Sequence, residues 1–167
     1  MTELTEVFST CLKGSVAVLG IGNRLRGDDG IGSLLAERLR GKVKGCVLDC
    51  GEVPENYTGE VKEARPRAIV LVDAVELGQE AGAIAAFRGR ELSGPGRMST
   101  HNPYLGVLAH YLEQETGAQV YLLGVQPKGT GFGEPMSREA ARTLEVLEDV
   151  LASCLGDESG ETTVREE

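Results

Sequence analysis

Asp29, Asp73 and His101 are the side chains of this chain whose types and positions best suit chemistry. Asp29 directly precedes an amphipathic helical pattern, Asp73 ends an apolar Ile-Val-Leu-Val run, and His101 stands ahead of another helical pattern. Two carboxylates and an imidazole form a mixed oxygen and nitrogen ligand set, which suits a borderline divalent metal. Such a set leaves coordination positions free for the ligands of a partner.

Each of these residues also has a purely structural interpretation. Asp29 or its neighbour Asp28 is placed to cap the helix that follows, although one capping acid leaves the other unexplained. Asp73 fits a strand-end turn, but burying its charge without partners is expensive. His101 fits a capping or surface imidazole. The second histidine, His110, lies away from the apolar stripe of its predicted helix, and we expect it to be solvated.

The glycine-rich loop at 20–30 raises the alternative of a nucleotide-binding α/β module. In that interpretation the loop cradles a dinucleotide and Asp49, at the end of the next predicted strand, binds a ribose. The fingerprint requires a third glycine at position 25, where this chain has Leu25. Two acids just before the helix also repel a pyrophosphate at its N-terminus. Both features count against this alternative.

Familiar nucleophile and zinc motifs are missing from the sequence. It contains no Gly-x-Ser-x-Gly elbow, no His-Glu-x-x-His helix and no Cys-x-x-Cys pair. Cys46 and Cys50 bracket an apolar strand, and we expect both to be buried, reduced thiols. A catalytic cysteine is the competing interpretation, but no histidine or helix start stands near either residue in the sequence to lower the pKa of its thiol.

Apolar runs and helical repeats alternate along the chain. We expect strands at 15–20, 46–49, 68–73, 83–87 and 120–124, and helices at 30–39, 54–64, 103–112 and 137–155. This alternation predicts an α/β fold, a three-layer α/β/α sandwich around a mainly parallel, about five-stranded sheet. Sites in such sheets gather at the carboxyl ends of the strands, so Asp29, Asp73 and His101 are expected on one rim.

Composition limits the partners and the domain count. The 167 residues suit one domain, expected at 1–156, followed by an acidic tail at 157–167 that we expect to be disordered. The net charge of −9 argues against nucleic acid as a partner, because phosphate-binding surfaces need clustered Lys and Arg. The apolar runs are too short to span a membrane, and no secretory signal is apparent. We therefore expect a cytoplasmic protein without a membrane partner.

Several ordered motifs resemble the hydrogenase maturation proteases, the endopeptidases that process the large subunit of nickel-iron hydrogenases. The resemblance spans most of the chain, from about residue 16 to 155, and is similar in detail to the branch serving formate-hydrogenlyase and related energy-converting hydrogenases. The motifs that carry it are Val-Leu-Gly-Ile-Gly-Asn at 18–23, Gly-Asp-Asp-Gly-Ile-Gly at 27–32, Pro-Glu-Asn at 54–56, Val-Asp-Ala at 72–74, Ser-Thr-His-Asn at 99–102 and Gly-Val-Gln-Pro at 124–127.

The resemblance implies an activity and a site. Asp29 matches the first acidic ligand of the family, Asp73 the second, and His101 the histidine. It implies that these residues contact nickel already carried by the large-subunit precursor, and that the C-terminal extension is cut away only after nickel insertion. Asp29 and Asp73 are then candidates for the catalytic base. A non-catalytic nickel-binding maturation chaperone that uses the same three residues stays open as an alternative.

Overall fold

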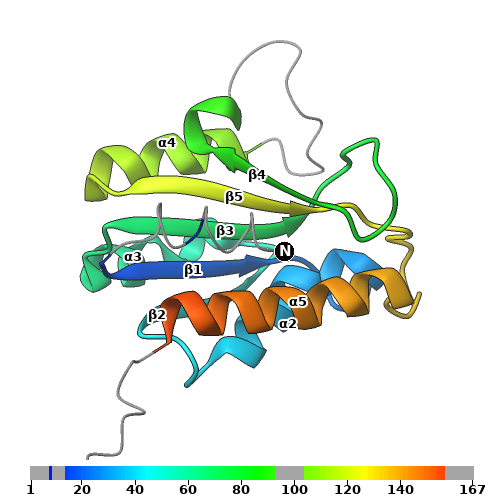
Figure 1. Cartoon of the computed structure of the whole chain (residues 1–167). Coiled ribbons are helices and arrows are strands. Elements are labelled where there is room, and N and C mark those ends of the chain that lie inside the picture. Colours follow the sequence, from blue (N-terminus) through cyan, green and yellow to red (C-terminus); the bar gives the residue numbers. More distant parts are fainter. Residues whose placement is uncertain (1–7, 9–13, 93–103, 157–167) are drawn as a thin grey trace, which may run out of the picture.

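The computed structural model of the chain describes residue 8 and residues 14–92 and 104–156. Its helices and strands are drawn in Figure 1. Two of the predictions, the position of His101 and the acidic tail at 157–167, fall outside the described residues.

A five-stranded sheet forms the centre of the structure. Its strands are β1 (Val16–Ile21), β2 (Gly45–Gly51), β3 (Ala68–Ala74), β4 (Ile84–Arg88) and β5 (Gln119–Val125), in the spatial order β2-β1-β3-β5-β4. The first four in that order run parallel, and β4 pairs antiparallel with β5. The five predicted strands and the mainly parallel sheet are therefore confirmed.

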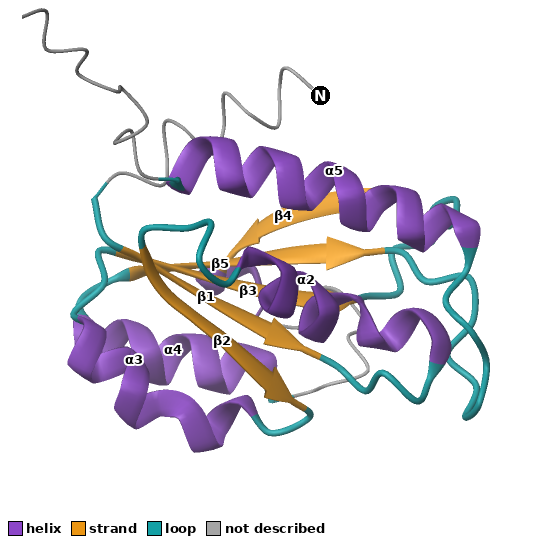
Figure 2. Cartoon of the chain, turned by 90° about the horizontal axis from the view of Figure 1, so that it is seen from below, coloured by secondary structure: helices purple, strands orange, loops and turns teal. Residues whose placement is uncertain are grey.

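Helices cover both faces of this sheet, as Figure 2 shows. The α-helices are α2 (Ile31–Leu39), α3 (Thr58–Ala64), α4 (Leu105–Thr116) and α5 (Arg138–Leu155), and the short 3-10 helices are η1 (Gly27–Gly30), η2 (Pro54–Tyr57) and η3 (Gly89–Leu92). The predicted helix at 54–64 is thus divided into η2 and α3. The arrangement confirms the three-layer α/β/α sandwich.

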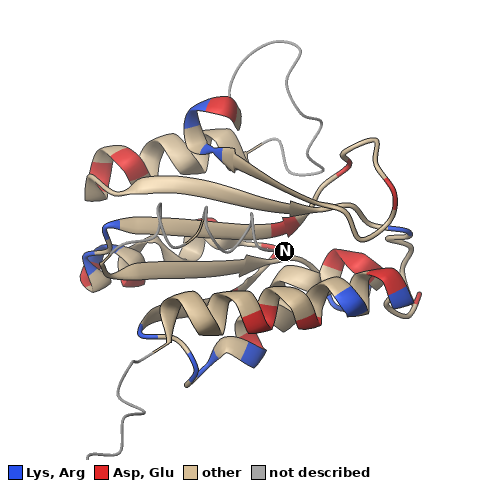
Figure 3. Cartoon of the chain, in the orientation of Figure 1, with Lys and Arg blue, Asp and Glu red and all other residues tan. Residues whose placement is uncertain are grey.

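Alternate residues of each central strand build two separate cores. In β1, Val16 and Val18 face the core shared with α2 and α5, whereas Ala17 and Leu19 face the core shared with α3 and α4. A strand covered on both faces must be apolar at every position, which is why β1 and β3 are nearly continuous hydrophobic runs. Figure 3 shows that the charged residues accordingly lie mostly on helices and connections. Within the described part of the chain, no helix combines the length and apolar character needed to cross a membrane.

The chain leaves β1 and β3 towards opposite edges of the sheet. From β1 the chain passes through α2 to β2 on one side, and from β3 it continues to β4 and β5 on the other. The loops after β1 and β3 therefore diverge and leave a crevice outside their carboxyl ends, the position where ligands bind in open α/β sheets.

Gly32 lets α2 lie directly against these strand ends. A Cβ built at Gly32 would overlap the backbone oxygens of Val72 and Ile21. The first turn of α2 therefore lies in backbone contact with both β1 and β3, so the helix start has a fixed position relative to the crevice.

We expect Gly32→Ala to destabilise the fold by about 3 kcal/mol, because the added methyl group meets backbone that has nowhere to move. Gly59→Ala is the matched control: it also lies in a helix, no atom lies within 4 Å of the position that its new methyl group would take, and it should gain up to about 1 kcal/mol from helix propensity. Urea unfolding of both variants measures the difference. Equal stabilities would contradict the close contact.

Candidate active site

Asp73 belongs to β3, a strand in which every residue is buried. It lies near the carboxyl end of β3, is only 5% exposed, and its Oδ1 accepts a hydrogen bond of 2.9 Å from the N–H of Ala74. Burial raises the pKa of Asp73 well above its ordinary value; the charge of Asp29 raises it further, and the Ala74 N–H opposes the shift. A carboxyl group in this position holds its negative charge at a high energetic cost.

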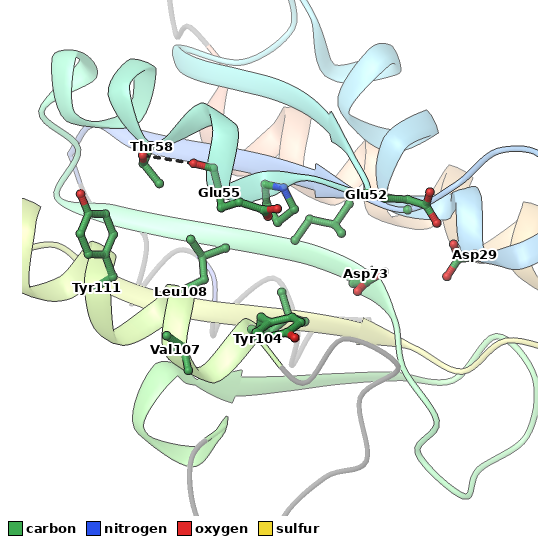
Figure 4. Close-up of a pocket in the computed structure, with 13 residues that line it drawn as sticks. Asp29, Glu52, Glu55, Thr58, Asp73, Tyr104, Val107, Leu108 and Tyr111 are labelled. Atoms are coloured by element: carbon green, nitrogen blue, oxygen red, sulfur yellow. Dashed lines mark hydrogen bonds between the residues drawn. The ribbon is translucent and has the colours of Figure 1, made fainter.

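Asp29 reaches the same place from the loop after β1. It belongs to η1, and its Oδ2 accepts a hydrogen bond of 2.9 Å from the N–H of Asn23. Gly22 has φ +140, and a Cβ there would overlap the carbonyl oxygen of Asp29, so only glycine allows the loop to fold back this closely. The Asp29 and Asp73 carboxylates lie at the same end of one cleft in Figure 4.

Asp28 has a different role from its neighbour. Its side chain is 1% exposed and accepts hydrogen bonds from the N–H of Lys128 at 2.8 Å, the N–H of Ser137 at 2.7 Å and the Ser137 hydroxyl at 2.7 Å. The prediction that Asp28 or Asp29 caps α2 is wrong, because the N-cap of α2 is Gly30 and no side chain caps it. Asp28 instead links the loop after β1 to the loop after β5.

Asp49, the residue assigned to a ribose in the nucleotide alternative, is already engaged in a local network. Its carboxylate accepts from the Arg24 guanidinium at 2.8 Å and from the Ser33 hydroxyl at 2.7 Å, and Arg24 also pairs with Glu37 at 2.7 Å. A ribose would have to displace these bonds. The network instead ties the loop that carries Asp29 to α2 and β2.

The cleft that contains both aspartates has a volume of about 850 Å³. It runs from the strand ends along α4, with Tyr104, Leu108 and Tyr111 on one wall and Glu55 on the opposite wall, as Figure 4 shows. Sequence reasoning missed this wall. The signal was available, because Tyr104, Leu108 and Tyr111 recur at i, i+4 and i+7 and so share one face of a helix.

The charged side chains that line the cleft are all acidic, although the Lys62 ammonium donates a 2.6 Å hydrogen bond to the hydroxyl of Tyr111 on one wall. Glu52 and Glu55 line it together with Asp29 and Asp73, whereas no described lining residue is Lys or Arg. Among the ion pairs found within the described ranges, none involves Asp29 or Asp73. The same part of the chain holds no cluster of three potential metal ligands. The structure therefore brings together two of the three predicted site residues, and the third, His101, lies outside what it describes.

The prediction of buried, reduced thiols is confirmed for Cys50 but only in part for Cys46. Cys50 is buried and Cys46 half-buried, and both are free thiols. Burial, followed by the charge of Asp49, raises the pKa of Cys50 to about 12. A nucleophilic cysteine needs the opposite shift. Neither residue lines the cleft, so the geometry gives no support to a catalytic thiol.

Comparison with known proteins gives a consistent result. Residues 31–153 match the family model described as hydrogenase maturation protease. The hydrogenase 3 maturation protease of Escherichia coli K12 is 36% identical over 132 residues, which cover 78% of this chain and 84% of that protein. The crystal structure of the nickel-iron hydrogenase maturation protease HycI from Thermococcus kodakarensis superposes with a TM-score of 0.81 at 36% identity, covering 89% of this chain and 98% of that one. The maturating endopeptidase HybD from Escherichia coli, at 22% identity and a TM-score of 0.67 over 84% of this chain and 91% of that one, shares the fold.

The adjacent aspartates should respond oppositely to the same substitution. Asp28→Asn replaces one of the two acceptor oxygens by an NH₂ group, which faces a donor and leaves it without an acceptor. We therefore expect the free energy of unfolding to fall by about 3 kcal/mol. Asp29→Asn keeps an oxygen for the Asn23 N–H and relieves repulsion with Asp73, so its stability should stay within about 0.5 kcal/mol of the parent or exceed it. Chemical denaturation distinguishes the two; a reversed order would assign the structural role to Asp29.

Asp73→Asn should stabilise the metal-free protein. The pKa of Asp73 is higher in the folded than in the unfolded state, so the folded protein holds this proton more tightly. The resulting contribution to the stability of the parent protein is lost as pH rises through the folded pKa. The variant should therefore have the higher Tm near pH 7–8, by about 2–4 °C for each kcal/mol gained, and lose this advantage towards the unfolded pKa of about 3.9. Thermal melts with a chelator across this pH range test it; a lower Tm at pH 8 would contradict the analysis.

Proposed function

The chain belongs to the hydrogenase maturation protease family, and from this premise we propose that it is an endopeptidase that removes the C-terminal extension of a nickel-iron hydrogenase large-subunit precursor. The relatives that support this are named for hydrogenase maturation, and the 36% identity to the hydrogenase 3 enzyme supports the branch predicted from the motifs.

The observation that carries the proposal is the pair of neighbouring carboxylates without a cationic partner among the described residues. Asp29 and Asp73 raise each other's energy in the crevice, because like charges in a partly buried site repel. A divalent cation between them turns that repulsion into attraction on both sides. We propose nickel in the precursor as that cation, with His101 as the third contact from this chain.

An incomplete ligand set explains how a protease recognises a finished cofactor. Two carboxylates and one imidazole leave coordination positions of a metal ion open, and the precursor's own ligands fill them. The chain then holds nickel firmly only when the metal arrives inside its substrate. Nickel is thus part of the substrate, and a precursor that lacks it forms a weaker complex.

The same arrangement suits peptide-bond hydrolysis. Nickel in the precursor polarises the scissile carbonyl or an attacking water, and Asp29 or Asp73 accepts the proton that the water loses. The proton passes to the departing amine as the carbon–nitrogen bond breaks, so the products are a new carboxyl terminus and a free extension peptide. A role for Cys46 or Cys50 is not needed.

Intact-mass analysis tests the function directly. We expect the nickel-loaded precursor incubated with this protein to lose a C-terminal peptide, whereas the nickel-free precursor stays intact. Asp73→Asn should reduce the cleavage rate at least about 100-fold, the effect typical of losing a positioned acid–base group. Cys50→Ala, a buried change outside the cleft, should cleave at the parental rate.

Other outcomes assign other functions. Full activity of Asp73→Asn would contradict the proposed role of this residue. Binding of the loaded precursor without any cleavage by the unmodified protein would favour the chaperone.

A further inference from the structure

Two clefts meet at Asp29, one of the two proposed nickel-contacting carboxylates. The first is the 850 Å³ cleft along α4; the second, of about 350 Å³, is lined by Arg26, Thr130 and Phe132. Both are lined by Asp29 and Glu52. The two clefts thus form a continuous path across the carboxyl edge of the sheet, with Asp29 at the point where they join.

Four of the six exposed large apolar side chains of the described residues line this path. Tyr104, Val107 and Tyr111 line the larger cleft and Phe132 lines the smaller one. Val53 stands in the chain between two residues of the larger cleft, and the Leu25 carbonyl accepts a 2.7 Å hydrogen bond from Gly133, next to Phe132. The six residues are Leu25, Val53, Tyr104, Val107, Tyr111 and Phe132. Apolar groups concentrated in one region mark an interaction surface.

Helix α4 presents two apolar stripes rather than one. Leu105 and Leu112 are buried against the sheet, as expected for a helix of this fold. Tyr104 and Val107 remain 72% and 69% exposed on the side that lines the cleft. This second stripe is exposed, so covering it with a partner's apolar surface gains binding free energy.

Charge selects among the possible occupants. Four carboxylates line the larger cleft, and this chain has a net charge of −9 and an acidic sequence at 157–167. A second copy or the chain's own tail would therefore meet like charge. A partner with an apolar surface flanked by positive charge is complementary, and a charged rim of this kind accelerates association.

We propose that the α4 face of the larger cleft docks the folded body of the precursor, and that the smaller cleft holds the C-terminal extension that is cut off. This inference rests on the proposed function and adds a direction to it. The segment before the scissile bond remains attached to a folded domain, which needs the wider apolar surface. The extension is a chain end, and the narrower cleft beside Arg26, Thr130 and Phe132 accommodates it.

Matched charge insertions on α4 test the docking face. Val107→Asp should raise KM for the nickel-loaded precursor at least about tenfold, which corresponds to about 1.4 kcal/mol, while kcat at saturation stays within about twofold. His110→Asp introduces the same charge at an exposed position of the same helix that does not line the cleft, and it should cleave with the parental KM and kcat. Thermal melts establish that both variants fold.

Photo-crosslinking during turnover tests the direction. With p-benzoylphenylalanine in place of Val107, the labelled precursor peptide should come from the part retained after cleavage. With the same group in place of Phe132, it should come from the extension. Reversed labelling, or labelling of neither, overturns the proposed direction.

The outcomes separate this inference from the function on which it rests. If the unmodified protein leaves the loaded precursor intact, the proposed function fails. If it cleaves the precursor but Val107→Asp and His110→Asp behave alike, the docking face is wrong. Loss of a dimer in Val107→Asp alone, measured by sedimentation, would assign the face to a second copy and overturn the proposal.

Discussion

The hydrogen bonds accepted by Asp28 hold the working edge of this molecule together. Three donors from the segment after β5 converge on one buried carboxylate in the loop after β1, two of them backbone N–H groups. A 3-10 helix has about three residues per turn, so neighbouring side chains point in widely different directions. With Asp28 fixed inward towards Lys128 and Ser137, Asp29 is turned towards the cleft. The position of the proposed nickel contact therefore depends on a residue that never touches the metal.

The fold followed from the sequence because its signals are local. Apolar runs such as the one that ends at Asp73 predicted the strands, and the leucine repeat before Leu155 predicted α5 with Ser137 at its start, where its hydroxyl accepts from the Ala140 N–H. Alternation of these elements then placed Asp29 and Asp73 at one edge, as the structure confirms. The division of 54–64 into η2 and α3 was beyond a pattern that does not distinguish short helix types.

The role of Asp28 was not predictable in this way. Its partners lie 100 and 109 residues further along the chain, and two of the three donors are backbone groups that carry no sequence signature. The capping prediction for the Asp28–Asp29 pair was therefore wrong, although one acid of the pair is indeed structural. The exposed stripe on α4 was missed for another reason: the leucines at 105, 108 and 112 account for a core-facing helix by themselves, and they leave Tyr104, Val107 and Tyr111 on the adjoining face without an evident role. The nickel contact by His101 remains a prediction.

The hydrogen bonds to Asp28 also limit which substitutions this protein can accept during evolution. A substitution at position 28 leaves the backbone N–H groups of residues 128 and 137 without their acceptor. A second substitution at 128 or 137 cannot remove such an N–H group unless it introduces proline. A change of Asp28 therefore cannot be compensated by a side-chain substitution at the donor positions. Asp29 faces open space and depends on one backbone donor, so a longer acid fits there with little rearrangement. We therefore expect related proteins to carry either aspartate or glutamate at position 29 and aspartate alone at position 28.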